Sequence, residues 1–259
     1  MCLVVLAFEC HPLYRLVLAA NRDEFHDRPA APLGWWRDAP QVLAGRDLAA
    51  GGTWLGVDRR GRLGVVTNFR DPATVRPAAP SRGALIPRFL SGDAGARDFA
   101  AGLAGESPGL SGFSLLVFDG EAIAYAANHP RTEARALEPG IYGLSNHALD
   151  TPWPKLALTR ERFAAQVGPD RLDAGPLLRL LRDRRPAPDD ALPDTGIGLE
   201  RERMLSSPFI VGDGYGTRCT TVVLVGRDGL VRVEECRYGR DGEPTGRTSV
   251  AFSVTHGSA

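Results

Sequence analysis

The chain has 259 residues, of which 43% are hydrophobic and 24% charged, as in an ordinary soluble globular protein near the upper size of a single core. Its 31 basic residues balance its 31 acidic ones, which argues against nucleic-acid or anionic-membrane binding through a broad basic face. One basic residue, Lys155, is lysine and the rest are arginine, which we attribute to compositional bias.

The apolar run at residues 3–8 is far below the ~20 residues of a membrane span, and it lacks the basic segment and cleavage site of a signal peptide. The four cysteines, at positions 2, 10, 219 and 236, show neither CxxC pairing nor zinc-ligand spacing. We therefore expect a cytoplasmic protein with reduced thiols and without a membrane span, a metal or a resident cofactor.

Short β-type runs with turn signals dominate both ends of the chain. Hairpins are predicted over 2–21, turning at 10–13; over 53–69, turning at 58–61; over 113–128, turning at Asp119-Gly120; and over 217–239, turning near Asp228-Gly229. Single strands are predicted at 140–146 and 247–254.

Helices are predicted between these blocks, at 84–92, 96–105, 153–167 and 174–183, with connectors at 72–80 and 183–200. The order lacks regular βαβ alternation, so it favours antiparallel sheets with helices packed outside them, an α+β fold. If the first and last strands share a sheet, residues 1–259 form one domain.

Cys2 is the first candidate for chemistry. An initiator methionine before a residue as small as cysteine is normally removed, so the mature chain is expected to begin with a thiol and a free α-amine on one carbon. The α-amine has a reference pKa of about 7.7 to 8.0, so part of it is neutral at pH 7 and can take the thiol proton. None of the five histidines stands in a cysteine-protease signature, so the pattern favours an N-terminal nucleophile with the amine as base.

The tetrapeptide Asn21-Arg22-Asp23-Glu24 ends an apolar run at 16–20, and a hairpin over 2–21 brings it level with Cys2. A carboxylate there can hold the amine by a charge-assisted hydrogen bond. Unopposed, its charge at ~4 Å is worth a few kcal/mol at an effective dielectric of about 20, which would raise the pKa of the amine by about two or three and spoil it as a base. We expect Arg22, beside Asp23, to offset that charge.

Five motifs in order, ANRDEF (20–25), GGTWLG (51–56), TNFR (67–70), LSN (144–146) and GTRCTT (216–221), resemble the NRDE-motif family, also called the transport and Golgi organisation protein 2 family. The resemblance runs from Cys2 to the final strands. It implies the N-terminal nucleophile hydrolase fold, a four-layer αββα sandwich of two antiparallel sheets flanked by helices. Within that fold it extends to choloylglycine hydrolases and penicillin V acylases, which cleave amides with an N-terminal cysteine.

Carried over residue by residue, the resemblance makes Cys2 the nucleophile, Asp23 the carboxylate that orients its amine, and Asn68 a donor of the oxyanion hole. It also makes Asn146 a second active-site asparagine and Arg218 the arginine near the nucleophile. One position departs from the hydrolases, which carry an arginine where this chain has Ala20; Arg22 is the nearest replacement. We expect substrate contacts from Asn21, Trp54 and Phe69.

Three readings of the function remain open. The first is a cysteine amidohydrolase or acyltransferase that attacks a non-peptide C–N bond. The second is a binding or trafficking protein on the same fold, for haem or an acyl-CoA-type lipid, because members of the family have been linked to both; haem would then be carried cargo. The third, a structural or interaction module, leaves the polar residues around Cys2 unexplained.

Overall fold

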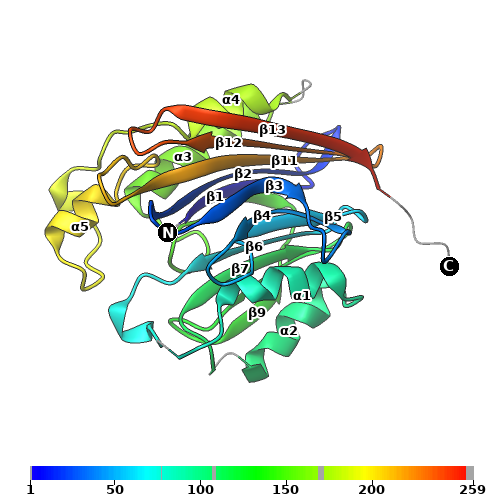
Figure 1. Ribbon diagram of the computed structural model, residues 1–259, viewed down its shortest axis with the longest axis horizontal. Coiled ribbons are helices and arrows are strands. Elements are labelled where there is room, and N and C mark those ends of the chain that lie inside the picture. Colours follow the sequence, from blue (N-terminus) through cyan, green and yellow to red (C-terminus); the bar gives the residue numbers. More distant parts are fainter. Residues whose placement is uncertain (1, 77, 107–108, 169–171, 255–259) are drawn as a thin grey trace.

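The computed structural model of the protein describes residues 2–76, 78–106, 109–168 and 172–254. Its strands form a six-stranded sheet, in the order β10-β1-β2-β11-β12-β13, and a seven-stranded sheet, in the order β3-β4-β5-β6-β7-β8-β9 (Figure 1). Neighbouring strands are antiparallel throughout both sheets.

The strands of the six-stranded sheet are β1 (Cys2–Phe8), β2 (Tyr14–Phe25), β10 (Gly140–Leu144), β11 (Tyr215–Gly226), β12 (Leu230–Tyr238) and β13 (Pro244–Ser253). Those of the seven-stranded sheet are β3 (Ala30–Trp35), β4 (Val42–Asp47), β5 (Leu55–Asp58), β6 (Leu63–Asn68), β7 (Phe113–Phe118), β8 (Ile123–Ala127) and β9 (Glu133–Ala136). The helices are α1 (Leu85–Ser91), α2 (Ala96–Glu106), α3 (Pro154–Gln166), α4 (Ala174–Leu180) and α5 (Leu199–Met204), with short 3-10 turns η1 (Pro72–Thr74), η2 (Arg82–Ala84) and η4 (Asp189–Ala191). None of the helices in the described ranges has the length and apolar character needed to cross a membrane.

Three apolar cores give the molecule its layers, because successive side chains of a strand point to opposite faces of its sheet. In β1, Val4 and Leu6 face the core between the two sheets, whereas Leu3 and Val5 face the core beneath α3 and α4. A third core lies between the seven-stranded sheet and the helices α1 and α2. The predicted αββα sandwich is therefore confirmed, as Figure 1 also shows.

The predicted hairpins, the two single strands and the four helices all form, and β1 and β13 belong to the same sheet. Three strands were not predicted, β3, β4 and β9. Two boundaries also need correction. Strand β2 continues through the whole tetrapeptide to Phe25, and α5 begins at Leu199, inside the predicted connector 183–200.

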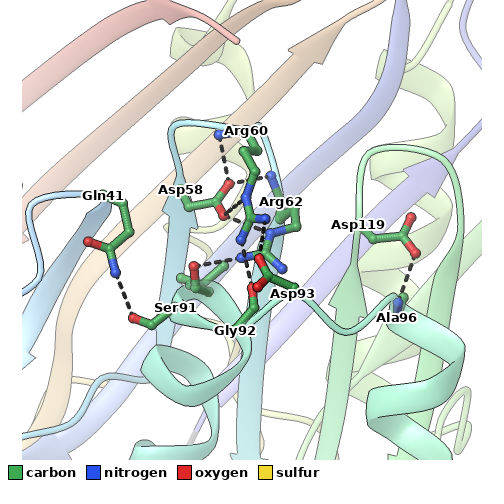
Figure 2. Close-up of polar contacts among 10 residues, drawn as sticks. Gln41, Asp58, Arg60, Arg62, Ser91, Gly92, Asp93, Ala96 and Asp119 are labelled. Atoms are coloured by element: carbon green, nitrogen blue, oxygen red, sulfur yellow. Dashed lines mark hydrogen bonds and ion pairs between the residues drawn. The ribbon is translucent and has the colours of Figure 1, made fainter. Parts of the chain in front are cut away.

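The turn between β5 and β6 contains a set of charges, the turn cluster, made of the buried Asp58 and Arg62 and the exposed Arg60. Asp58 Oδ1 accepts hydrogen bonds from the backbone N–H groups of Arg60 and Arg62, each at 2.9 Å. Asp58 Oδ2 lies 2.7 Å from Arg62 Nε, and Arg62 Nη2 donates to the Leu90 carbonyl at the end of α1, 2.6 Å away (Figure 2). The turn cluster thus fixes the hairpin and joins it to α1.

Candidate active site

A cleft of about 280 Å³ opens beside Cys2. Its walls come from β1, β2, β6, η2 and the segment before β5, which are far apart in sequence. Five of the predicted site residues line it: Cys2, Arg22, Asp23, Trp54 and Asn68. The remaining lining residues are Glu24, Phe25, Arg28, Asp47, Thr53, Val66, Ser81, Arg82 and Gly83.

Cys2 occupies the first position of β1, and its neighbours in the sheet position it. In the β1–β2 hairpin Cys2 pairs with Arg22, as predicted, so the tetrapeptide does lie beside it. On the other side, Val4 pairs with Leu144, which brings the residues after β10 level with Cys2. Burial raises the pKa of the Cys2 thiol, so its deprotonation calls for a nearby base.

Asn146 connects Cys2 to the end of β6. Its Oδ1 accepts a hydrogen bond from Cys2 N at 3.2 Å, and its Nδ2 donates to the Asn68 carbonyl at 3.0 Å. The residue is fully buried and has a φ of 57°, a left-handed conformation that asparagine tolerates better than most residues. Asn146, which was predicted as a second active-site asparagine, is therefore a side chain that accepts a hydrogen bond from the nitrogen of Cys2.

Asn68 ends β6 and is exposed to the cleft. Its carbonyl is held by Asn146, which fixes the backbone. Within the described part of the chain its side-chain amide makes no hydrogen bond, so its N–H groups are available to a ligand. An available amide donor beside a thiol is the arrangement that an oxyanion hole requires.

Asp23 lies at the back of the cleft in a buried set of charges, the cleft cluster, made of Asp23, Lys155, Arg70 and Glu202. All four residues are less than 7% exposed. Asp23 Oδ1 accepts a hydrogen bond from Thr217 Oγ1 at 2.7 Å. Burial raises the pKa of Asp23, and the positive charge of Lys155 opposes that rise more than any other group does.

Arg70 and Glu202 form the second pair of the cleft cluster. Arg70 Nη1 lies 2.7 Å from Glu202 Oε2, and its guanidinium stacks over the Trp153 ring at 4.4 Å. The other Glu202 oxygen accepts hydrogen bonds from the backbone and hydroxyl of Thr195. Lys155, Arg70 and Glu202 were not predicted as site residues, because they come from α3, the segment after β6, and α5.

Arg22 faces the core between the sheets, on the side of β2 opposite to Asp23. Its guanidinium stacks over Trp54 at 4.2 Å, and Gly45 leaves room for that ring, because a Cβ there would come within 2.5 Å of it. The expectation that Arg22 offsets Asp23 thus needs correction: the cation that most strongly opposes the burial-raised pKa of Asp23 is Lys155. Adjacent residues of a strand point to opposite faces, which accounts for the difference.

Four predicted site residues do not line the cleft: Asn146, described above, and Arg218, Asn21 and Phe69. Arg218 is the extra residue of a β-bulge in β11, and its Nη1 donates to the carbonyls of Phe25 and Arg28, beside a neighbouring cavity. On the helix side of the sheet, Asn21 Nδ2 donates hydrogen bonds to the carbonyls of Leu181 and Pro208, and Asn21 Oδ1 accepts one from Thr220 Oγ1.

Phe69 packs against the rings of His147 and His129, with centroid distances of 4.6 and 5.7 Å. The aromatic residues that do face the cleft are Trp54 and Phe25. Within the described ranges there is also no group of three or more His, Cys, Asp or Glu side chains that could hold a metal ion.

The comparisons with known proteins identify the family. The family model described as Transport and Golgi organisation 2 matches residues 1–240. The chain belongs to this family. It is 36% identical over 257 residues to the Transport and Golgi organization protein 2 homolog of Bos taurus and 36% identical over 256 residues to that of Homo sapiens, with 91% of this chain and 92% of each relative covered.

Among solved structures, the N-acylethanolamine-hydrolyzing acid amidase ortholog of Caenorhabditis elegans is similar at a TM-score of 0.49 and 10% identity. That comparison covers 86% of this chain and 92% of the amidase.

Proposed function

We propose that the chain is an N-terminal cysteine amidohydrolase or acyltransferase that acts on a non-peptide C–N bond after Met1 is removed. The observation that carries the proposal is that Cys2 and the available amide of Asn68 line one cleft, while Asn146 accepts a hydrogen bond from the nitrogen of Cys2. These groups suit a nucleophile, an oxyanion donor and a holder for the α-amine.

The reaction begins when the neutral α-amine of Cys2 takes the proton of its own thiol. The thiolate attacks the carbonyl carbon of the amide, and the oxygen that becomes negative accepts a hydrogen bond from Asn68 Nδ2. As the C–N bond breaks, the protonated α-amine gives its proton to the leaving nitrogen, and a thioester on Cys2 remains. Water releases the acid from the thioester, whereas another amine or alcohol in its place would receive the acyl group.

The lining of the cleft favours a small polar substrate or the polar head of a longer one. Its volume of about 280 Å³ is at the low end of ligand pockets, and its large apolar side chains are those of Phe25, Trp54 and Val66. A carrier of haem or of an acyl-CoA-type lipid would need a wider apolar wall. The lining therefore supports the enzyme over the carrier.

We expect the reaction to take place in the cytoplasm, where cellular reductants keep thiols reduced. The cysteines of the chain are free thiols, which suits that environment.

The test inserts one glycine between Met1 and Cys2, so that processing exposes glycine and the nitrogen of Cys2 stays in a peptide bond. The thiol is kept but its own amine base is lost, and acylation of Cys2 should fall by roughly 10²- to 10⁴-fold. Acylation is measured by mass spectrometry on the Cys2 peptide with a panel of activated thioesters and N-acyl amines. Because Cys10 is exposed, a Cys10→Ser chain with the normal N-terminus serves as the control.

Undiminished acylation of Cys2 in the glycine-extended protein would overturn the proposal. Titration of the same two proteins with haem and with an acyl-CoA tests the carrier function. Equally tight binding of the ligand to both proteins, without acylation of Cys2 in either, would favour a carrier.

A further inference from the structure

Lys155 is placed where a lysine is costly. It is the one lysine of the chain, it is 3% exposed, and within the described residues its Nζ has no hydrogen-bond partner. It also lies in the first turn of α3, where the positive end of the helix dipole disfavours a cation. A buried ammonium group without hydrogen-bond acceptors destabilises a protein unless a nearby negative charge compensates it. The presence of a lysine at this position therefore needs an explanation.

The charges around Lys155 come from four different segments. Burial lowers its pKa to about 8 and Arg70 acts in the same direction, while Asp23, Cys2 and Glu202 act against this shift. Glu202 forms an ion pair with Arg70, whereas Asp23 accepts a hydrogen bond from Thr217 and Lys155 is the cation that most opposes the burial-raised pKa of its carboxyl. Among the groups that favour the charged form of Lys155, Asp23 has the largest effect.

Asp23 is also the carboxylate that influences Cys2, since it raises the pKa of the Cys2 thiol. A carboxylate close to an amine raises the pKa of that amine by roughly 1 to 3, which would keep the α-amine protonated at pH 7 and useless as a base. A cation near Asp23 removes this difficulty. Arg22 is not placed to be that cation, because its guanidinium stacks on Trp54 on the other side of β2.

We propose that Lys155 is a positioning residue for the Cys2 reaction: its ammonium group offsets the carboxylate of Asp23, so that the α-amine of the mature chain remains a base. This inference rests on the proposed function, because it assigns Lys155 a part in activating the same thiol. Lys155 acts through Asp23 and does not touch the substrate.

The experiment uses the mature protein and follows the pKa of its α-amine directly. After Met1 removal the chain contains two amines, the N-terminus and Lys155, so amine acylation at limiting reagent over pH 5–10, resolved by peptide, reports the α-amine without any turnover. In Lys155→Met the pKa of the α-amine should rise by about 1 or more. Lys155→Arg, which keeps the charge, should restore the lower value.

Arg160→Met is the matched control, because Arg160 lies on the same helix but is 42% exposed and paired with Asp150. It removes a positive charge outside the cleft cluster and should leave the pKa of the α-amine as it is. If Lys155→Met does not fold, selective ¹³Cε-lysine labelling of the unmutated protein gives a single resonance. Its titration near pH 8 supports the inference, and titration near 10.4 overturns it.

An α-amine with the same pKa in the folded Lys155→Met variant and in the unmutated protein also overturns the inference. The two hypotheses fail in different ways. If Cys2 is acylated but the pKa of the α-amine does not depend on Lys155, only the role of Lys155 is refuted. If the pKa of the α-amine depends on Lys155 but Cys2 is never acylated, the proposed function is refuted and the charge compensation is retained.

Discussion

The turn cluster and the cleft cluster each combine buried carboxylates with buried cations, but they differ in how completely the polar atoms around them are hydrogen-bonded. In the turn cluster, Asp58 accepts from two backbone N–H groups and two arginines, and Arg62 also reaches the Leu90 carbonyl. At the cleft, two buried polar atoms have no hydrogen-bond partner in the described ranges: Lys155 Nζ of the cleft cluster and Nη1 of Arg22, which lines the cleft.

This difference separates a structural site from a functional one. Buried polar groups in proteins are nearly always hydrogen-bonded, so exceptions gathered beside a cleft need an explanation. Ionisable groups whose pKa values are shifted by burial and by neighbouring charges are typical of active sites, where they can interact with substrates and exchange protons. We therefore expect mutations in the turn cluster to affect stability, and mutations around the cleft to affect chemistry.

The largest effect is expected from Asp23→Asn, which keeps the shape of the side chain and removes its charge. If Asp23 acts on the amine of Cys2, acylation should fall by roughly 10²- to 10⁴-fold. The melting temperature should change little, because Lys155 has a pKa lowered to about 8 and can release its proton when its counter-charge is lost. Thiol-acylation kinetics and thermal unfolding of the same protein check both parts.

The matched substitution in the other cluster, Asp58→Asn, should have the opposite profile. Breaking a buried ion pair by removing one partner typically costs about 3–5 kcal/mol, because the remaining charge is left buried. We expect that loss in urea unfolding, with unchanged acylation per folded molecule. A stable Asp58→Asn protein, or an unstable but active Asp23→Asn protein, would reverse the assignment of the two clusters.

The sequence predicted the fold where its signals are local. The hairpins were found because Asp-Gly and similar turns separate β-type runs, as between β7 and β8 or between β11 and β12. Strands β3 and β9 lack such signals: β3 contains Pro32 and Gly34 and has an irregular register, and β9 is a four-residue edge strand. Their conformation depends on pairing with neighbouring strands.

The residues predicted for the site come together where one motif supplies both position and orientation. Cys2, Asp23 and Asn68 reach one cleft because the register of β1, β2 and β6 follows from their turns. The bulge that turns Arg218 away and the contacts of Lys155, Arg70 and Glu202 arise from tertiary packing, which has no local pattern. The one available signal was that Lys155 is the only lysine, and composition alone appeared to explain it.

Asn68→Ala tests the oxyanion donor, and we expect an effect somewhat smaller than that of Asp23→Asn. Removing one donor of an oxyanion hole typically lowers kcat by about 10²- to 10³-fold, or roughly 3 kcal/mol. Because the side chain is exposed to the cleft and makes no hydrogen bond within the described residues, stability should stay the same. Equal acylation rates for Asn68→Ala and the unmutated protein would remove Asn68 from the site.

The smallest effect is a difference in the pH dependence of stability between the unmutated protein and Lys155→Met. Burial lowers the pKa of Lys155 to about 8, whereas a lysine in an unfolded chain titrates near 10.4. Between these values the unfolded chain binds more protons than the folded one, so the contribution of Lys155 to the free energy of unfolding rises with pH, by roughly 2 kcal/mol from pH 8 to 10. Other groups titrate in the same range, but they are common to both proteins and cancel in the difference. Between pH 8 and 10, the free energy of unfolding measured in urea should therefore rise more, or fall less, for the unmutated protein than for Lys155→Met. Equal changes in the two proteins would show that Lys155 has the pKa of a solvent-exposed lysine.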